Sequence, residues 1–170
     1  MACKVISIFG NKGGVGKTFV TVNLATSLTL AEYKVLIIDL DFQAGQDMAR
    51  MLNISPRQSI ADLLSHLETS DDPGFIKRYA SVHSSGLHLL PAAKNTKQIS
   101  LITPDNIKLF FKRAMDSYDY ILVDAGKSFD ENLITVLDYS NLILLVATPD
   151  ILAVYQIKWC LDILQYASSS

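Results

Sequence analysis

The stretch that most limits what this chain can fold into is residues 10–18, Gly-Asn-Lys-Gly-Gly-Val-Gly-Lys-Thr. An apolar run, Val5–Phe9, precedes it, and apolar residues at helical spacing follow it over 18–30. A strand, a glycine loop and a helix N-terminus in this order form a phosphate cradle, because backbone N–H groups and the positive end of the helix dipole face the same anion. Lys17 adds a full positive charge to that cradle. The sequence therefore predicts a nucleotide-binding site in this loop.

The composition of the chain narrows the class of protein. Its 170 residues are 49% hydrophobic and 19% charged, which fits one domain with a large core. The net charge of −2 argues against bulk electrostatic attraction to nucleic acid or acidic lipid. Cys3 and Cys160 lie near opposite ends of the sequence, which favours reduced thiols in a cytosolic protein over a disulfide framework. Since the apolar stretches are too short to span a bilayer, we expect a cytoplasmic protein.

Apolar runs alternate with helical patterns along the chain. Strands are expected at 5–9, 35–38, 87–90, 121–124 and 142–146, and helices at 18–30, 60–64, 104–117, 130–137 and 151–166. This alternation favours a three-layer α/β/α fold, in which helices cover both faces of a mostly parallel, twisted sheet. In the last helix, Tyr155, Trp159 and residues 161–164 are expected to belong to the core, with part of the helix exposed as the alternative if the domain is truncated. We find no repeat and no linker, so residues 1–170 are predicted to form a single domain.

Carboxylates stand at the ends of two expected strands. Asp39 and Asp41 end the second strand and Asp124 ends the fourth, and ligands of parallel sheets bind at these ends. Thr18 is placed to give a hydroxyl to Mg²⁺, and Asp124 to hold the ion through water. Asp39 and Asp41 are two apart in an extended segment, so their side chains are expected to point the same way, one near the metal and one near the γ-phosphate water. Because these residues include no covalent nucleophile, the predicted reaction is Mg²⁺-dependent hydrolysis of a nucleoside triphosphate by positioned water.

The loop also carries a second lysine, Lys12, which a general phosphate loop does not need. With it, residues 12–18 resemble the deviant Walker A motif of the ParA/MinD superfamily of ATPases, and residues 35–41 and 118–124 resemble its Walker A′ and Walker B segments. The resemblance implies that Lys12 reaches the nucleotide of a partner subunit in a homodimer that shares ATP. It also implies that Asp41 orients the attacking water.

The same resemblance implies ATP and Mg²⁺ as cofactors and assigns the site residues. Lys12, Lys17 and Asp41 would be catalytic, and Thr18, Asp39 and Asp124 would serve the metal. Gly126 either donates its N–H to the γ-phosphate or only permits a turn. Phe19 stands where many relatives have a second threonine that serves the α-phosphate. The residues assigned to the nucleotide are Gly13, Gly14, Val15, Gly16, Lys17, Thr18, Phe19 and Gly126.

Two further segments, 39–47 and 124–130, are similar to the TadZ/CpaE pilus-assembly branch of the superfamily. This similarity implies a slow, dimerising positioning ATPase that localises a pilus or secretion apparatus, recruited to a cell pole or the inner face of the membrane. Two alternatives stay open: a MinD/FlhG-type regulator of division site or flagellar number, and a nucleotide-dependent scaffold with little turnover. The family usually continues with further strands that carry adenine contacts, so the P-loop ATPase domain is expected to be incomplete at its C-terminus.

Overall fold

The computed structural model describes residues 2–10, 12–42, 47–70, 72, 74–93, 95–126 and 129–168. Its strands form one six-stranded sheet in the order β3-β4-β2-β5-β1-β6. All neighbouring strands are parallel except β3, which pairs antiparallel with β4 at one edge. The strands are β1 (Lys4–Phe9), β2 (Val35–Asp39), β3 (Ser81–Val82), β4 (His88–Leu90), β5 (Tyr120–Asp124) and β6 (Leu142–Leu145).

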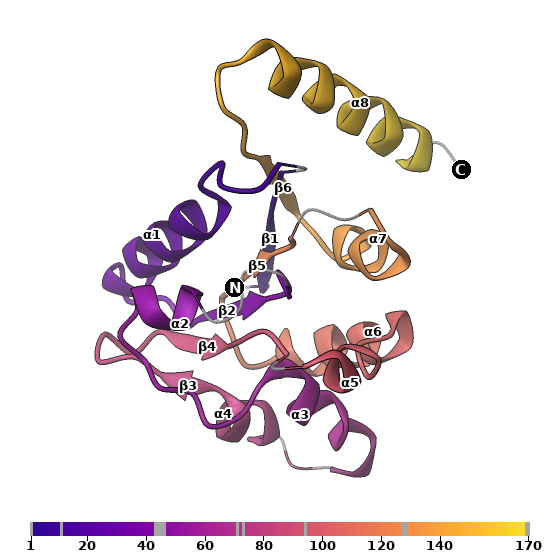
Figure 1. Cartoon of the computed structure of the whole chain (residues 1–170). Coiled ribbons are helices and arrows are strands. Elements are labelled where there is room, and N and C mark those ends of the chain that lie inside the picture. The colour runs from indigo at the N-terminus through magenta and orange to yellow at the C-terminus, as the bar shows by residue number, and fades with distance from the viewer. Residues whose placement is uncertain are drawn as a thin grey trace.

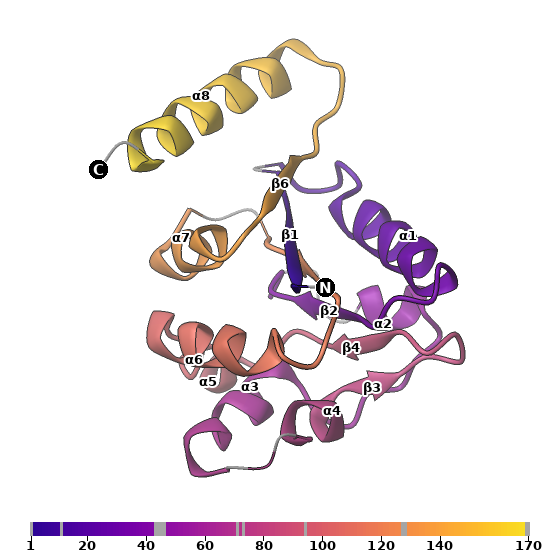
Figure 2. The same cartoon turned by 180° about the vertical axis from the view of Figure 1, so that it is seen from behind.

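Helices cover both faces of this sheet (Figures 1 and 2). One face carries α1 (Lys17–Leu30) and α2 (Asp47–Met51). The other carries α3 (Ile60–Leu64), α4 (Phe75–Tyr79), α5 (Thr96–Ile99), α6 (Pro104–Ala114) and α7 (Glu131–Asp138), with a short 3₁₀ helix at Leu67–Thr69. The last helix, α8 (Ile151–Ser168), lies beyond the edge strand β6. The predicted three-layer α/β/α architecture is confirmed.

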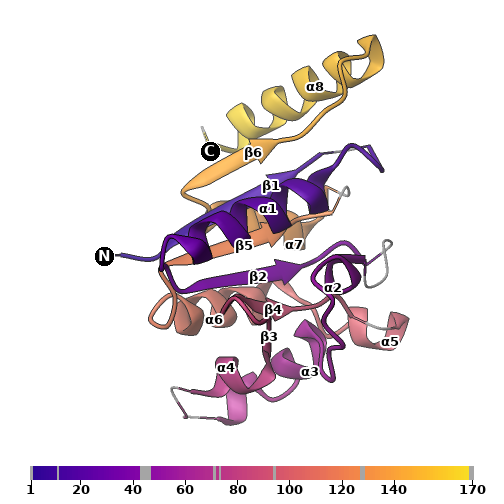
Figure 3. The same ribbon diagram turned by 90° about the vertical axis from the view of Figure 1, so that its left-hand side faces the viewer.

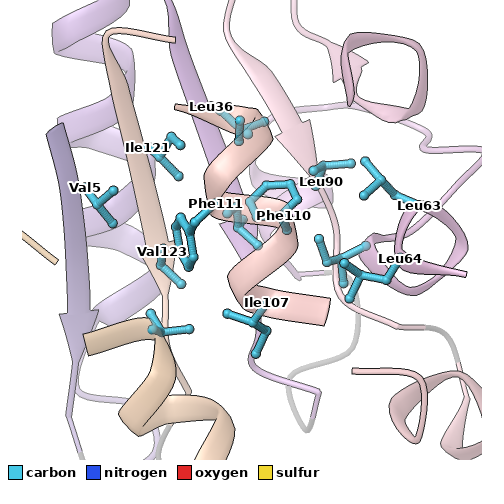
Figure 4. Packing of buried hydrophobic residues seen from close by; sticks show 14 of the residues in the cluster. Val5, Leu36, Leu63, Leu64, Leu90, Ile107, Phe110, Phe111, Ile121 and Val123 are labelled. Atoms are coloured by element: carbon cyan, nitrogen blue, oxygen red, sulfur yellow. The ribbon is translucent and has the colours of Figure 1, made fainter. Parts of the chain in front are cut away.

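The central strands are buried on both faces, which is why their apolar runs hardly alternate with polar residues. Val5 and Leu36 pair in register with Ile121 and face the side of α6, whereas the alternate residues face α1. In Figure 4 the strand residues Val5, Leu36, Ile121 and Val123 lie opposite Ile107, Phe110 and Phe111 of α6. Burying a large apolar side chain of this kind contributes roughly 1.5–3 kcal/mol.

Local sequence signals explain where α6 begins. The side chain of Thr103 caps the helix by accepting a hydrogen bond from the backbone N–H of Asn106, and Pro104 occupies the first turn. Proline is favoured there because the N–H it lacks has no partner within the helix. The prediction of this helix from its proline is confirmed, although it ends at Ala114, earlier than expected.

The expectation for the last helix is wrong in one respect. Residues 151–168 are helical, but the side chains of Tyr155, Trp159 and Leu161 are 67%, 53% and 48% exposed. Helical spacing shows that a face is apolar but not that another element covers it, and α8 lies at the edge of the sheet. Of its apolar residues, only Ala153 and Cys160 are buried within the described part of the helix. Across the described ranges, no helix combines the length and apolarity needed to cross a bilayer.

Gly10, directly after β1, lies against the backbone at the end of β6. A Cβ atom on Gly10 would be 2.5 Å from the carbonyl oxygen of Val146, which is closer than any real contact. Gly10→Ala is therefore expected to lower the free energy of unfolding by about 1–3 kcal/mol. Thermal melting checks this, since about 1 kcal/mol shifts the midpoint by roughly 2–4 °C in a chain of this size. Gly13→Ala is the control, because no atom lies within 4 Å of a Cβ there; equal losses in both variants would contradict the expectation.

Candidate functional site

The candidate site lies where the carboxyl ends of three neighbouring strands meet. β2, β5 and β1 are adjacent and parallel (Figure 3), and their register brings the glycine loop, Asp39 and Asp124 to the same edge of the sheet. Backbone hydrogen bonds hold the segments that follow: Leu40 N–H donates to Asp124 O at 2.9 Å, and Ala125 N–H donates to Ile8 O at 3.0 Å. The predicted convergence of these strand ends is confirmed.

The glycine loop has a backbone that favours glycine. Gly14 and Gly16 adopt φ of 74° and 101°, in the left-handed region where a side chain is strained. Gly16 also precedes α1, and Val20 N–H donates to its carbonyl oxygen at 2.9 Å. In the described structure no side chain caps this end of α1. The N–H groups of its first turn are therefore available to an anion.

Lys17 is buried at the start of α1. Its side chain is only 5% exposed, and its Nζ lies 3.7 Å from Oδ2 of Asp41, whose side chain is 13% exposed. The expectation that an extended segment carries both Asp39 and Asp41 is wrong, because β2 ends at Asp39. The backbone N–H of Asp41 instead turns back and donates to Oδ1 of Asp39 at 3.0 Å. The protein thus holds Lys17 next to the carboxylate of Asp41, two residues after the end of β2.

Thr18 and Asp124 form the second pair of the site. Oγ1 of Thr18 donates to Oδ2 of Asp124 at 2.6 Å, and Asp124 is fully buried. Asp39 is also buried and lies in register with Asp124 on the neighbouring strand. Burial raises the pKa of Asp39 well above its ordinary value, and the charge of Asp124 adds to this effect. Burial also raises the pKa of Asp124, against the opposing effects of Thr18 and Lys17.

This chemistry fits a divalent cation. Oδ1 of Asp124 is buried and accepts no hydrogen bond from the described residues. A carboxylate oxygen and a hydroxyl are ligands that Mg²⁺ accepts, and this ion commonly uses one or two protein ligands together with phosphate oxygens and water. The described residues contain no group of three or more His, Cys, Asp or Glu side chains able to hold a metal. A cation here would therefore depend on phosphates for much of its coordination, and its binding would favour proton loss from Asp39.

Lys12 forms an ion pair that the sequence did not reveal. Its Nζ lies 3.2 Å from Oδ2 of Asp150, at the start of α8. Asp150 also accepts hydrogen bonds from the hydroxyl of Thr148 at 2.5 Å and from the N–H of Ala153 at 3.0 Å. The Thr148 hydrogen bond, with those from Ala153 and Lys12, lowers the pKa of Asp150 to about 2. An aspartate directly before an apolar helical pattern is a capping signal that could have indicated this residue.

The remaining predicted residues lie in the glycine loop, in the first turn of α1 and after β5. Val15 is partly buried, and Phe19 projects outward with 63% of its surface exposed. Gly126 has φ of 67°, and a Cβ there would lie 3.4 Å from Leu40 O, so the turn alone accounts for glycine at this position. The N–H contact of Gly126 with a phosphate stays a prediction, as do the catalytic and ligand roles of the other residues.

A glycine loop between the first strand and helix, a buried lysine, and a Thr–Asp pair at neighbouring strand ends define a P-loop nucleotide-binding fold. A family model described as an AAA domain matches residues 3–169. The chain belongs to this family and, with it, to the ParA/MinD superfamily of P-loop ATPases.

Individual proteins agree with this assignment. The antiactivator FleN of Pseudomonas aeruginosa is 28% identical over 86% of this chain and 51% of its own length. A ParA family ATPase from Chlorobium tepidum superposes with a TM-score of 0.86 at 25% identity, over 95% of this chain and 67% of the other. The MinD protein of Pyrococcus horikoshii, solved with Mg-ADP, superposes with a TM-score of 0.78 at 22% identity, over 97% and 66%. This chain spans about half the length of its sequence relatives.

Proposed function

We propose that the chain is the nucleotide-binding part of a dimerising positioning ATPase that binds ATP with Mg²⁺ and hydrolyses it slowly. The observation that carries this proposal is the buried Lys17 at the end of the glycine loop. The next residue, Thr18, is hydrogen-bonded to the buried carboxylate of Asp124. Kinship with MinD, ParA and FleN proteins supports a nucleotide-dependent switch over a metabolic enzyme. In this proposal residues 1–170 form one P-loop ATPase domain.

The proposed mechanism assigns a task to each group. The loop N–H groups and Lys17 bind the phosphate oxygens, with the ammonium exchanging its contact with Asp41 for the nucleotide. Thr18 and Asp124 would hold Mg²⁺, with Asp39 supporting the ion from the neighbouring strand, and the bound ion would supply charge neutralisation at the phosphates. Asp41, whose carboxylate contacts Lys17, orients the attacking water once Lys17 engages the phosphate. Because the groups position and stabilise charge without forming a covalent bond, catalysis rests on electrostatic preorganisation.

Lys12 supplies the test of the dimer. In the proposal its ammonium leaves Asp150 and contacts the ATP of a second subunit, so the dimer forms with ATP and not with ADP. In sedimentation velocity, the wild type is expected to form a dimer with a non-hydrolysable ATP analogue and to stay a monomer with ADP. Lys12→Ala is expected to remove this difference, whereas Lys34→Ala, at an exposed lysine, keeps it. A nucleotide-dependent dimer in the Lys12→Ala variant would contradict the role of Lys12.

The proposal also names the cellular apparatus that the ATPase positions. The segments 39–47 and 124–130 support a pilus or secretion apparatus of the TadZ/CpaE type, reached through protein partners at a pole or membrane face. The similarity to septum site-determining MinD proteins and to the antiactivator FleN supports a second candidate equally well, a MinD/FlhG-type regulator of division site or flagellar number. Counting pili and flagella in cells that lack the gene separates the two. The third candidate is a nucleotide-dependent scaffold with little turnover. It requires that the wild type releases phosphate no faster than the Asp41→Ala variant.

A further inference from the structure

A cavity of about 290 Å³ opens beside the nucleotide site, on the opposite side of the sheet from α1. Asp41 and Gly126, from the segments that follow β2 and β5, form part of its wall. The rest is formed by α7 with its capping residue Asp130, and by Ile99 and Ile102, which precede α6. The segments that follow β2 and β5 therefore belong both to the cavity wall and to the candidate nucleotide site.

The walls are mainly apolar, with three polar side chains among the described lining residues. The apolar part is formed by Leu40, Phe42, Ile99, Ile102, Leu133 and Val136. The polar residues among the described lining residues are Asp41, Asp130 and Asn132, and none of the described lining residues is basic. A wall of this composition favours an apolar ligand body that ends in hydrogen-bond donors.

Asn132 provides the most specific observation. Its Nδ2 donates to the carbonyl oxygen of Ile102 at 2.9 Å, which fixes the orientation of the amide. The carbonyl oxygen of the same amide, Oδ1, is buried and accepts no hydrogen bond from the described residues. A buried acceptor without a donor costs free energy, and a ligand whose donor reaches Oδ1 after a small movement of the cavity wall recovers it.

Asp130 adds a negative charge near this amide. Its Oδ1 accepts the N–H of Leu133 at 2.8 Å and so caps α7, which fixes the position of the carboxylate at the cavity. A ligand head that donates several hydrogen bonds and carries positive charge satisfies both side chains, and charge-assisted hydrogen bonds are the stronger kind.

We propose that this cavity binds a guanidinium or ammonium group on a short apolar stem, carried by a small molecule or by a side chain of another protein. The stem packs on Ile102, Leu133 and the other apolar walls, and the head donates to Asn132 and Asp130. The volume matches a ligand of this size, at the lower end of the range for small-molecule sites.

Occupancy of this cavity is coupled to the nucleotide, a consequence that rests on the proposed function. Residues 40–42 and 125–126 line the cavity and also follow the strands that carry Asp39 and Asp124. A ligand that favours one arrangement of these segments changes nucleotide affinity, and the nucleotide changes ligand affinity by the same factor.

The test uses n-butylguanidinium as the probe and the methyl NMR signals of Ile99, Ile102, Leu133 and Val136 as reporters, first without nucleotide. We expect these signals to shift in a saturable way, while the methyl signals of Ile54, on the α1 side of the sheet, stay unchanged. Asp130→Asn is the matched variant, because asparagine retains the helix cap but lacks the charge. It is expected to weaken binding about five-fold, as the loss of one charge-assisted hydrogen bond implies.

Neutral n-butylurea, of similar shape, separates charge recognition from apolar filling. Absence of any shift, or equal shifts with n-butylurea and n-butylguanidinium, overturns the proposal. A capped Gly-Gly-Arg-Gly-Gly peptide that binds more tightly than the free probe assigns the site to a protein side chain, and weaker binding assigns it to a small molecule. Repeating the titration with Mg-ADP tests the coupling. Because the first titration contains no nucleotide, failure of the cavity and failure of the proposed ATPase give different results.

Discussion

ATP binding is expected to weaken about a hundred-fold when Lys17 is replaced by alanine, a loss of about 2.7 kcal/mol. Lys17 is the buried cation at the glycine loop, and truncating one member of a buried charge pair costs about 2–5 kcal/mol. The variant also leaves the carboxylate of Asp41 without its lysine, which adds repulsion toward phosphate. Isothermal titration calorimetry with ATP and Mg²⁺ measures the effect directly.

The control for this experiment is Lys34→Ala, which removes an exposed lysine of the same charge far along the chain. It is expected to bind ATP as the wild type does. Far-UV circular dichroism of both variants checks that the fold persists. Equal ATP affinity in Lys17→Ala and the wild type would show that the loop is not the phosphate site.

ATP hydrolysis is expected to fall at least about a hundred-fold in Asp124→Asn. A bound Mg²⁺ ion stabilises the negative charge of the transition state by several kcal/mol, and the variant binds this ion less well. Asparagine has nearly the same shape and still offers an oxygen to the hydroxyl of Thr18, so the fold is expected to persist. What it lacks is the charge that binds Mg²⁺. Steady-state phosphate release measured against Mg²⁺ concentration should show a lower rate and a higher Mg²⁺ requirement.

Asp116→Asn, at an exposed aspartate after α6, is the matched control and is expected to keep the rate and Mg²⁺ dependence of the wild type. Nucleotide binding in the absence of Mg²⁺ is expected to survive in Asp124→Asn, which separates a metal defect from a folding defect. An Asp124→Asn variant with normal turnover would remove Asp124 from the proposed metal site.

Most of the fold could be predicted because its main elements carry long, consistent patterns. Residues 5–9 and 121–124 are buried on both faces, so their apolar runs are unambiguous, and α6 begins at a capping threonine followed by proline. The elements missed are short: β3 has two residues, α2 and α4 have five each, and α5 has four. Segments of that length do not span enough turns to show a period, and their conformation is set by tertiary packing.

The site was predictable to the level of residue types but not of contacts. Parallel strand order brings Asp39, Asp124 and the glycine loop together, and that follows from topology alone. The pairing of Lys17 with Asp41 and of Lys12 with Asp150 depends on side-chain positions that spacing does not encode. The exposure of Trp159 was unpredictable for the same reason, since a helical pattern does not identify its neighbours.

The close packing of Gly10 against Val146 has a mechanical consequence. The end of β1 is also joined to β6 through Val146 N–H, which donates to Phe9 O at 2.8 Å, and the loop is joined to α8 through Lys12 and Asp150. With no space for a side chain between Gly10 and Val146, a displacement of the segment that leads into α8 is expected to displace the start of the phosphate loop. A force that tilts α8 therefore reaches the loop without passing through the nucleotide.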